Sequence, residues 1–210
     1  KACSDLVDWQ RRILADDPLF ISVNISSKQF LRPTLIEDIR KILNDCGLSP
    51  SQLKLEITET TLMENTEDNL LLMQRLKNLG IQIVIDDFGT GYSSMSYLHR
   101  FPIDTLKVDR SFVSNLGNGI GGHKNIVEAI VTLAHTLNIN VVAEGVETAF
   151  QYAVLSDMKC QSAQGFLFSE PLATRGMSKL LEHIKGFGRV HPGHPYKIYP
   201  QEAVQPTPSR

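Results

Sequence analysis

The strongest structural signal in the sequence lies at residues 81–113, which read IQIVIDDFGTGYSSMSYLHRFPIDTLKVDRSFV. Two short runs within it, Ile81–Ile85 and Thr105–Val108, are rich in β-branched and apolar residues, which is typical of strands. Acidic residues follow each run directly: Asp86 and Asp87 after the first, and Asp109 after the second. The segment therefore predicts two buried strands that carry carboxylates at their ends.

The same pattern continues in both directions from this segment. Further strands are predicted at Leu19–Ile25, Leu53–Ile57, Ile139–Ala143 and about Ser162–Phe168. Apolar residues at helical spacing predict helices near Ala2–Leu14 and at Thr34–Cys46, Glu67–Leu79, His123–Leu137, Ala149–Met158 and Met177–Ile184. Strands that alternate regularly with helices form parallel sheets through right-handed crossovers, so the predicted fold class is α/β.

Composition excludes several functions. The 210 residues hold 21 Lys+Arg and 23 Asp+Glu, a net charge of −2, so the chain lacks the excess basic charge needed to bind a DNA or RNA polymer or an anionic membrane. It contains no apolar run of roughly 18 residues that would span a bilayer. Its three cysteines show no C-x-x-C spacing, and an odd number gives no full disulfide framework, which favours a reducing compartment and predicts a cytoplasmic location.

Polar side chains lie at or just beyond the carboxyl end of every predicted strand. These residues are Asn24, Glu56, Glu59, Asp86, Asp87, Lys107, Asp109, Glu144, Glu147 and Gln164. In α/β folds and (β/α) barrels, ligands bind beyond the carboxyl ends of the strands. A single acid at a strand end is often just the N-cap of the next helix, but seven carboxylates on one rim would repel each other strongly. Lys107 alone does not balance them, so the pattern indicates bound divalent cations.

The residue types indicate which metals. Asparagine and carboxylate oxygens without His or Cys suit Mg²⁺, Mn²⁺ or Ca²⁺. The adjacent pair Asp86–Asp87 is suited to two ions about 4 Å apart, an arrangement that promotes in-line attack of water on a phosphodiester. Lys107 would then hold or deprotonate the water, or stabilise the developing negative charge. The residues alone therefore predict a divalent-metal (β/α) enzyme.

Five segments resemble the EAL-domain family, the phosphodiesterases that hydrolyse the bacterial second messenger cyclic di-GMP. They are VNISSKQF (23–30), LKLEITET (53–60), IVIDDFGTGYSSMSYLHRFPIDTLKVDRSFV (83–113), VVAEGVET (141–148) and QGFLFSEPL (164–172), in the order and spacing of the family. The likeness extends from about Lys1 to Leu181. It implies a (β/α)8 TIM-type barrel. It also implies that two Mg²⁺ or Mn²⁺ ions support hydrolysis of cyclic di-GMP to linear pGpG, and that Ca²⁺ inhibits this reaction.

The resemblance also implies residue roles at the matching positions. The implied metal ligands are Asn24, Glu56, Asp86, Asp87 and Glu144. The implied catalytic set is Lys107, Gln164 and Glu144, together with Glu59, which matches the residue that steadies the loop Phe88–Ser94. Residues implied to contact the nucleotide are Asp109, Glu147, Phe166 and Pro171.

One family feature has no counterpart in the sequence. The family carries a Glu-x-Leu-x-Arg motif on its first strand, and no such segment precedes Asn24. A complete barrel takes about 250 residues. We therefore expect an N-terminally incomplete barrel at residues 1–185, with about six of eight strands, followed by a Pro/Gly-rich arm or linker at residues 186–210. As written, the chain is expected to lack one metal ligand, to be impaired in activity, and to be poorly stable unless a segment or partner fills the gap.

Two other functions stay open. A non-catalytic cyclic di-GMP receptor is the main alternative, and a different metal-dependent (β/α) enzyme, such as an enolase-like lyase, is a more distant one. The family also implies a homodimer formed through the barrel and fusion to upstream sensory or cyclase-type domains in a bacterial protein. A longer protein of this kind could also carry a membrane anchor outside the barrel. His99, His135, His191 and His194 are predicted to have no role in the site, and Trp9 is predicted to be a packing residue.

Overall fold

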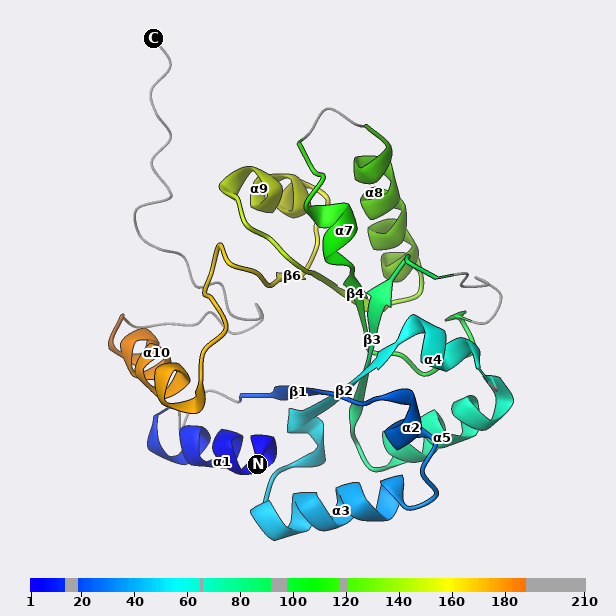
Figure 1. The fold of residues 1–210 in the computed structure, drawn as a ribbon, viewed down its shortest axis with the longest axis vertical. Helices are drawn as coiled ribbons and strands as arrows, with labels where there is room; N and C mark the ends of the chain where they lie inside the picture. Colours follow the sequence, from blue (N-terminus) through cyan, green and yellow to red (C-terminus); the bar gives the residue numbers. More distant parts are fainter. Residues whose placement is uncertain (14–18, 65, 92–97, 118–120, 188–210) are drawn as a thin grey trace.

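Six parallel strands form one curled sheet in the computed structural model, which describes residues 1–13, 19–64, 66–91, 98–117 and 121–187. The strands lie in sequence order: β1 (Ile21–Asn24), β2 (Leu53–Thr58), β3 (Gln82–Phe88), β4 (Thr105–Val108), β5 (Asn140–Ala143) and β6 (Ser162–Ala163). Helices lie outside the curl (Figure 1). The arrangement is that of an incomplete (β/α)8 barrel, as the sequence predicts, and within the described residues β1 and β6 are its edge strands.

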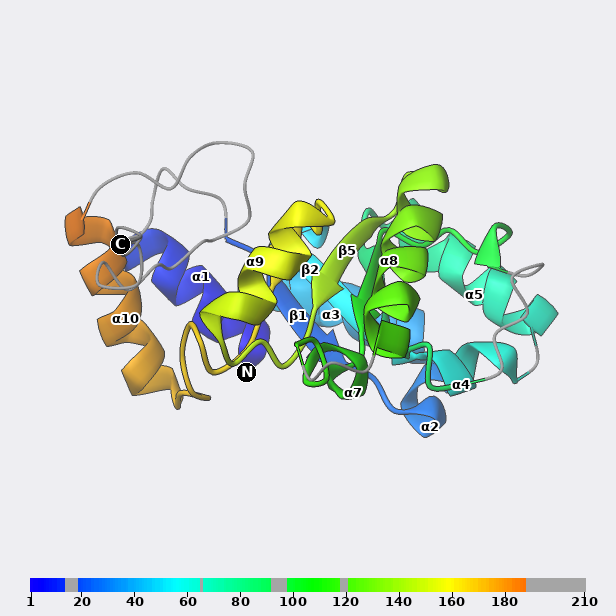
Figure 2. The same ribbon diagram turned by 90° about the horizontal axis from the view of Figure 1, so that it is seen from above.

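The larger helices agree closely with the predicted ones. They are α1 (Ala2–Arg12), α3 (Leu35–Cys46), α5 (Thr66–Asn78), α8 (Gly121–Thr136), α9 (Ala149–Asp157) and α10 (Thr174–Phe187). Helices α1 and α10 lie side by side (Figures 1 and 2), and Trp9 Nε1 donates a hydrogen bond to Ser178 Oγ at 2.9 Å between them. Trp9 is thus a packing residue, as predicted. The predicted arm would begin at Gly186, inside the last turn of α10, and residues 188–210 lie outside the described part of the chain.

Short helices that the apolar periodicity does not reveal follow three of the strand ends, and a 3-10 turn directly precedes β2. They are α2 (Ser27–Phe30), the 3-10 turn η1 (Pro50–Gln52), α4 (Glu59–Met63) and α7 (Arg110–Val113). Their start signals are local: Ser26 and Gln29 form a capping box before α2, and the side chains of Thr58 and Asp109 cap α4 and α7. These caps place Glu59 and Arg110 in the first turns of their helices, beside the strand ends.

The predicted strand Ser162–Phe168 is wrong after Ala163. The chain leaves the sheet there because Gly165 adopts φ +154° and its backbone lies against Val146. A Cβ atom at Gly165 would lie 2.3 Å from the backbone nitrogen of Val146, so only glycine fits this approach. Leu167 N donates to Val146 O at 3.0 Å and continues the turn. Leu167 and Phe168 pack against the core from this turn, whereas Phe166 is exposed, so the apolar run at 166–168 does not reflect sheet pairing.

Alternation along the strands divides the molecule into an apolar outer layer and a polar inner face. Leu55, Ile57, Ile83 and Ile85 are at most 2% exposed and belong to the core beneath the helices. Residues of the opposite parity line a cavity of about 620 Å³ inside the curl: Ser22, Lys54, Glu56, Val84, Thr105, Lys107, Asn140, Val142, Ser162 and Gln164. No helix in the described residues is long and apolar enough to cross a bilayer.

Candidate functional site

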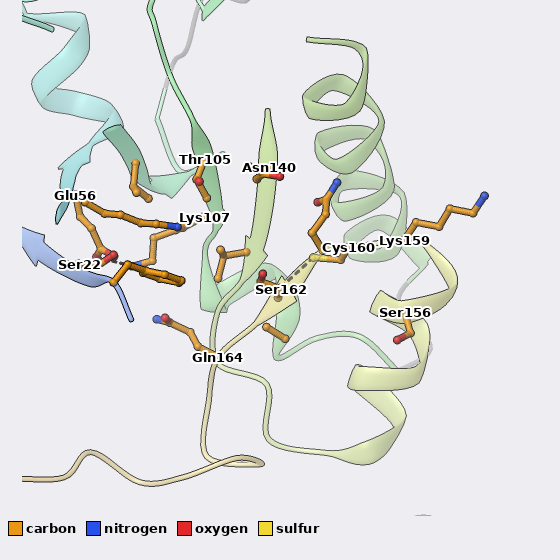
Figure 3. Close-up of a pocket in the computed structure, with 16 residues that line it drawn as sticks. Ser22, Glu56, Thr105, Lys107, Asn140, Ser156, Lys159, Cys160, Ser162 and Gln164 are labelled. Atoms are coloured by element: carbon orange, nitrogen blue, oxygen red, sulfur yellow. Dashed lines mark hydrogen bonds and ion pairs between the residues drawn. The ribbon is translucent and has the colours of Figure 1, made fainter. Parts of the chain in front are cut away.

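Lys107 stands at the centre of a buried cluster of charges. Its Nζ lies 2.8 Å from Glu56 Oε2, 3.0 Å from Asp86 Oδ1 and 2.5 Å from Glu144 Oε1. Lys107 belongs to β4, Glu56 to β2 and Asp86 to β3, whereas Glu144 directly follows β5. Figure 3 shows Glu56, Lys107 and Gln164 around the inner cavity. The structure thus brings residues from four successive strand ends to one point, as the sequence predicts.

The protonation of Lys107 follows from this environment. Burial by itself lowers the pKa of Lys107, but hydrogen bonds and charges from Glu144, Glu56 and Asp86 outweigh it and hold the pKa above its ordinary value. The ammonium is therefore charged at neutral pH. Of the roles predicted for this residue, this environment favours a hydrogen-bond donor over a general base.

Three carboxylates beside Lys107 have the geometry of a cation site. Asp86, Asp87 and Glu144 each present one oxygen, and these oxygens all lie within 4.8 Å of one another. Burial raises the pKa of Asp87, and the charges of Asp86 and Asp109 raise it further against the opposing effect of Lys107. Burial likewise raises the pKa of Glu144, which Lys107 partly offsets. A divalent cation would relieve this repulsion, so the oxygen-rich cluster is a candidate divalent-metal site.

Asp87 reaches this cluster only because the strand distorts. Strict alternation would point Asp86 inward and Asp87 outward. Instead, the register between β3 and β4 shifts between Ile85 and Phe88, and Asp87 adopts φ +55°. Such an irregularity re-aims a side chain, and aspartate tolerates the left-handed conformation better than most residues. The local sequence predicts that Asp87 belongs to the site but not how it gets there.

Asn24 takes its place through strand register. The last residue of β1, Asn24, pairs with Glu56 of β2, whose carboxylate contacts Lys107. The amide is at the same edge as the carboxylates and has the inward parity of Ser22 and Glu56. Its position fits an additional oxygen ligand for a metal ion.

Glu59 holds a loop and does not join the charged cluster. It is 2% exposed in the first turn of α4, and its Oε2 accepts a hydrogen bond from Gly89 N at 2.8 Å. A Cβ atom at Gly91 would lie 2.6 Å from Glu59 Oε1. The described start of the loop after Asp87 therefore rests directly on Glu59, which corresponds to the steadying role that the resemblance implies.

Gln164 connects the last strand to the cluster. Its Nε2 donates to Glu144 Oε1 at 2.6 Å, while its backbone O accepts from Val146 N at 3.1 Å. The same oxygen of Glu144 also contacts Lys107. Gln164 thus orients Glu144 from the side opposite β4.

The residues expected to contact a nucleotide lie on the rim. Phe166 is 57% exposed, and Pro171 is also exposed. Asp109 accepts a hydrogen bond from Ser111 N at 2.9 Å, so it does cap a helix, while its charge also acts on Asp87. Glu147 forms an ion pair with Arg110 at 2.5 Å. Arg110 was not among the predicted site residues, although its position directly after Asp109 was the available signal.

Four histidines are predicted to have no role in the site, and the structure describes two of them. His99 and His135 are exposed, with no contact to the cluster among those the structure gives. His191 and His194 lie outside the described residues.

Lys54, which the sequence analysis did not single out, faces the inner cavity with its Nζ 3.8 Å from the centre of the Phe20 ring.

Comparison with known proteins points to one family. The family model described as "EAL domain" matches residues 1–171. The chain is 40% identical over 181 residues to the cyclic di-GMP phosphodiesterase NbdA of Pseudomonas aeruginosa, which covers 86% of this chain and 23% of that protein. The chain spans about a quarter of the length of the curated relatives it matches.

Solved structures agree with this match. The structure described as PaMucR phosphodiesterase in complex with c-di-GMP superposes with a TM-score of 0.80 at 41% identity, covering 84% of this chain and 70% of that one. A manganese and cyclic di-GMP complex of Klebsiella pneumoniae BlrP1 gives a TM-score of 0.72 at 30% identity, covering 82% of this chain and 43% of that one. The similarity therefore extends to proteins that hold a divalent metal together with a cyclic dinucleotide.

Proposed function

Because the chain belongs to the EAL domain family, we propose that it forms part of a phosphodiesterase that hydrolyses cyclic di-GMP to linear pGpG. The observation that carries the proposal is the contact of Lys107 with three carboxylates from three other strand ends, beside the oxygen cluster of Asp86, Asp87 and Glu144. A receptor that only binds the dinucleotide has no chemical need for this arrangement. An in-line hydrolysis does need it, since charge develops on both the attacking and the leaving oxygen.

We assign the metal-holding role to Asn24, Glu56, Asp86, Asp87 and Glu144. Two Mg²⁺ or Mn²⁺ ions held there would acidify the attacking water and offset the charge of the scissile phosphate, whereas Ca²⁺, with its longer bonds and looser geometry, would inhibit. The fit rests on an all-oxygen donor set and on carboxylates whose pKa values are raised by burial.

The remaining side chains position the reactants. Lys107, kept protonated by its neighbours, would exchange one of its three carboxylate contacts for a hydrogen bond to the water or to a phosphate oxygen. Gln164 orients Glu144, and Glu59 holds the loop that follows Asp87. Asp109, Glu147, Phe166 and Pro171 would line the nucleotide pocket, where the exposed Phe166 ring offers a stacking surface for a guanine base.

The proposal extends to the whole protein. We propose that it acts in the bacterial cytoplasm as a homodimer formed through the barrel, with sensory or cyclase-type domains upstream. The small share of the relatives' length that the chain covers supports the presence of further domains.

Hydrolysis assays test this function. The protein is expressed with any sequence that precedes Lys1 in its gene product, and release of pGpG from cyclic di-GMP is followed by chromatography with Mg²⁺, Mn²⁺ or Ca²⁺. We expect turnover with Mg²⁺ or Mn²⁺, and a loss of at least about 100-fold in Glu56→Gln. Glu37→Gln, which alters an exposed acid of α3 outside the cluster, is the matched control and is expected to keep full activity.

Two results would contradict the proposal in different ways. Tight binding of cyclic di-GMP without hydrolysis in any metal would identify a receptor. Failure to bind cyclic di-GMP with and without Ca²⁺ would instead favour another metal-dependent (β/α) enzyme.

A further inference from the structure

Arg110 connects two neighbouring strand ends at the rim of the site. It begins α7 immediately after Asp109, at the carboxyl end of β4. Its Nη2 lies 2.5 Å from Oε1 of Glu147, which belongs to the loop between β5 and α9. In the described residues, Arg110 is the cation within ion-pair distance of Glu147. The pair therefore joins the segment that carries Asp109 to the segment that carries Glu144 and Glu147.

The aliphatic part of Arg110 makes a second contact with the same loop. Gly145 adopts φ +68°, and a Cβ atom there would lie 2.2 Å from Arg110 Cγ and 2.8 Å from its Cβ and Cδ. The arginine stem thus lies directly on the backbone of Gly145, where any side chain would displace it. Arg110 consequently holds the loop at two points, Gly145 and Glu147, on the side opposite Gln164.

The backbone of this loop has its own anchors. Glu144 N donates to Val108 O at 3.1 Å, Val146 N to Gln164 O at 3.1 Å, and Glu147 N to Gln151 Oε1 at 2.8 Å. These bonds hold the backbone of the loop at three positions, and Arg110 adds a contact at Gly145, but none of the three bonds holds the carboxylate of Glu147. The ion pair with Arg110 is what constrains that carboxylate.

Stability alone does not account for the pair. The side chains of Arg110 and Glu147 are 59% and 40% exposed, and ion pairs this exposed to solvent contribute little to stability. The position of the Arg110–Glu147 pair indicates another role, since the pair lies beside Asp109 on a rim with many carboxylates. A substrate with two phosphates would be repelled by an unpaired Glu147, and Arg110 both neutralises this charge and sets its direction.

We propose that Arg110 is a positioning residue for the cyclic dinucleotide. By packing on Gly145 and pairing with Glu147, it orients the Glu147 carboxylate toward the substrate. This inference rests on the proposed function of the site. It assigns Arg110 an action through Glu147 and not a direct contact with a phosphate.

A double-mutant cycle tests the proposal. Kinetics on cyclic di-GMP with Mn²⁺ are compared for the wild type, Arg110→Ala, Glu147→Ala and the double variant. We expect Arg110→Ala to raise KM about 5–10-fold with kcat within about twofold, and Arg110→Lys to restore KM partly because it keeps the stem and the charge. If Arg110 acts through Glu147, the double variant matches Glu147→Ala alone.

Two controls keep the cycle interpretable. Arg75→Ala removes an equally exposed arginine that pairs with Glu37 at 3.7 Å, far along the chain from the rim, and is expected to leave KM unchanged. Hydrogen exchange of residues 144–148 does not depend on any substrate and is expected to be faster in Arg110→Ala than in the wild type.

The outcomes separate this inference from the proposed function. If Arg110→Ala weakens binding further in the Glu147→Ala background, Arg110 contacts the substrate itself and the proposal is wrong. An unchanged KM or unchanged exchange in Arg110→Ala also overturns it. If the wild type does not act on cyclic di-GMP at all, the proposed function fails, and the exchange measurement still decides whether Arg110 holds the loop.

Discussion

Lys107 Nζ lies 2.8 Å from Glu56 Oε2, and this contact spans the inner face of the sheet from β4 to β2 with β3 between them. Both side chains are less than 10% exposed. The two side chains can meet across β3 because inward-facing positions of neighbouring strands form layers inside a curled sheet. The same layer gathers the groups to which we assign metal binding and catalysis.

Replacing Lys107 by methionine tests this layer directly. Lys107→Met leaves buried carboxylates without their cation, and removing one partner of a buried pair costs about 3–5 kcal/mol. We expect a loss of that size in the free energy of unfolding of the metal-free protein, and a fall of at least about 100-fold in kcat. Denaturant unfolding and hydrolysis assays measure the two effects. A variant as stable and as active as the wild type would show that the cluster contributes to neither.

Metal binding is expected to stabilise the folded chain. At a concentration of about 100 times Kd, a ligand specific for the native state contributes about 2.7 kcal/mol, which raises Tm by roughly 5–10 °C in a chain of this length. Thermal melts with Mn²⁺ and with a chelator measure this shift. Asp87→Asn should reduce it strongly, whereas Asp157→Asn, at an exposed acid of α9, should not. Equal shifts in both variants would place the metal elsewhere.

Gly165 is predicted to be intolerant of a side chain. Its φ of +154° and the 2.3 Å approach to Val146 N mean that Gly165→Ala strains the backbone by about 1–3 kcal/mol and shifts Gln164 away from Glu144. We expect a lower Tm together with lower kcat. Gly122→Ala is the matched control: the new Cβ would meet nothing within 4 Å in α8, so stability should change by less than about 1 kcal/mol, in the favourable direction. Similar melting temperatures for the two variants would contradict the argument.

The thiol of Cys160 is expected to react slowly. Burial raises its pKa to about 11, against smaller opposing effects of hydrogen bonds with the Ser162 and Ala143 backbone. At pH 8 only roughly one thiol in a thousand is then ionised, and the thiolate is the reactive form. Alkylation by iodoacetamide, followed at Cys160 by mass spectrometry, should rise about tenfold per pH unit from pH 7 to pH 10 in the folded protein. A rate that levels off below pH 9 would show a lower pKa.

Much of the fold could be predicted from local patterns. Five strands and the larger helices lie where apolar periodicity places them, because that periodicity reports which face of each element is buried. Glu56 and Lys107 could be assigned to one site for a similar reason, since each occupies the inward parity of a parallel strand. The ends of two helices also followed from local signals, namely the glycines after Cys46 and Leu79.

Other features depend on contacts between segments far apart in the sequence. Asp87 joins Asp86 because β3 slips against β4, β6 ends early because Gly165 packs on Val146, and Arg110 enters the rim because Gly145 leaves room for its stem. No local pattern contains these relations, since each depends on the distance between two backbones that meet only in the folded chain. The sequence alone therefore determined which residues lie at the strand ends, because periodicity and turn residues are local, whereas the tertiary structure decided which of them touch, that Arg110 joins them, and what holds them there.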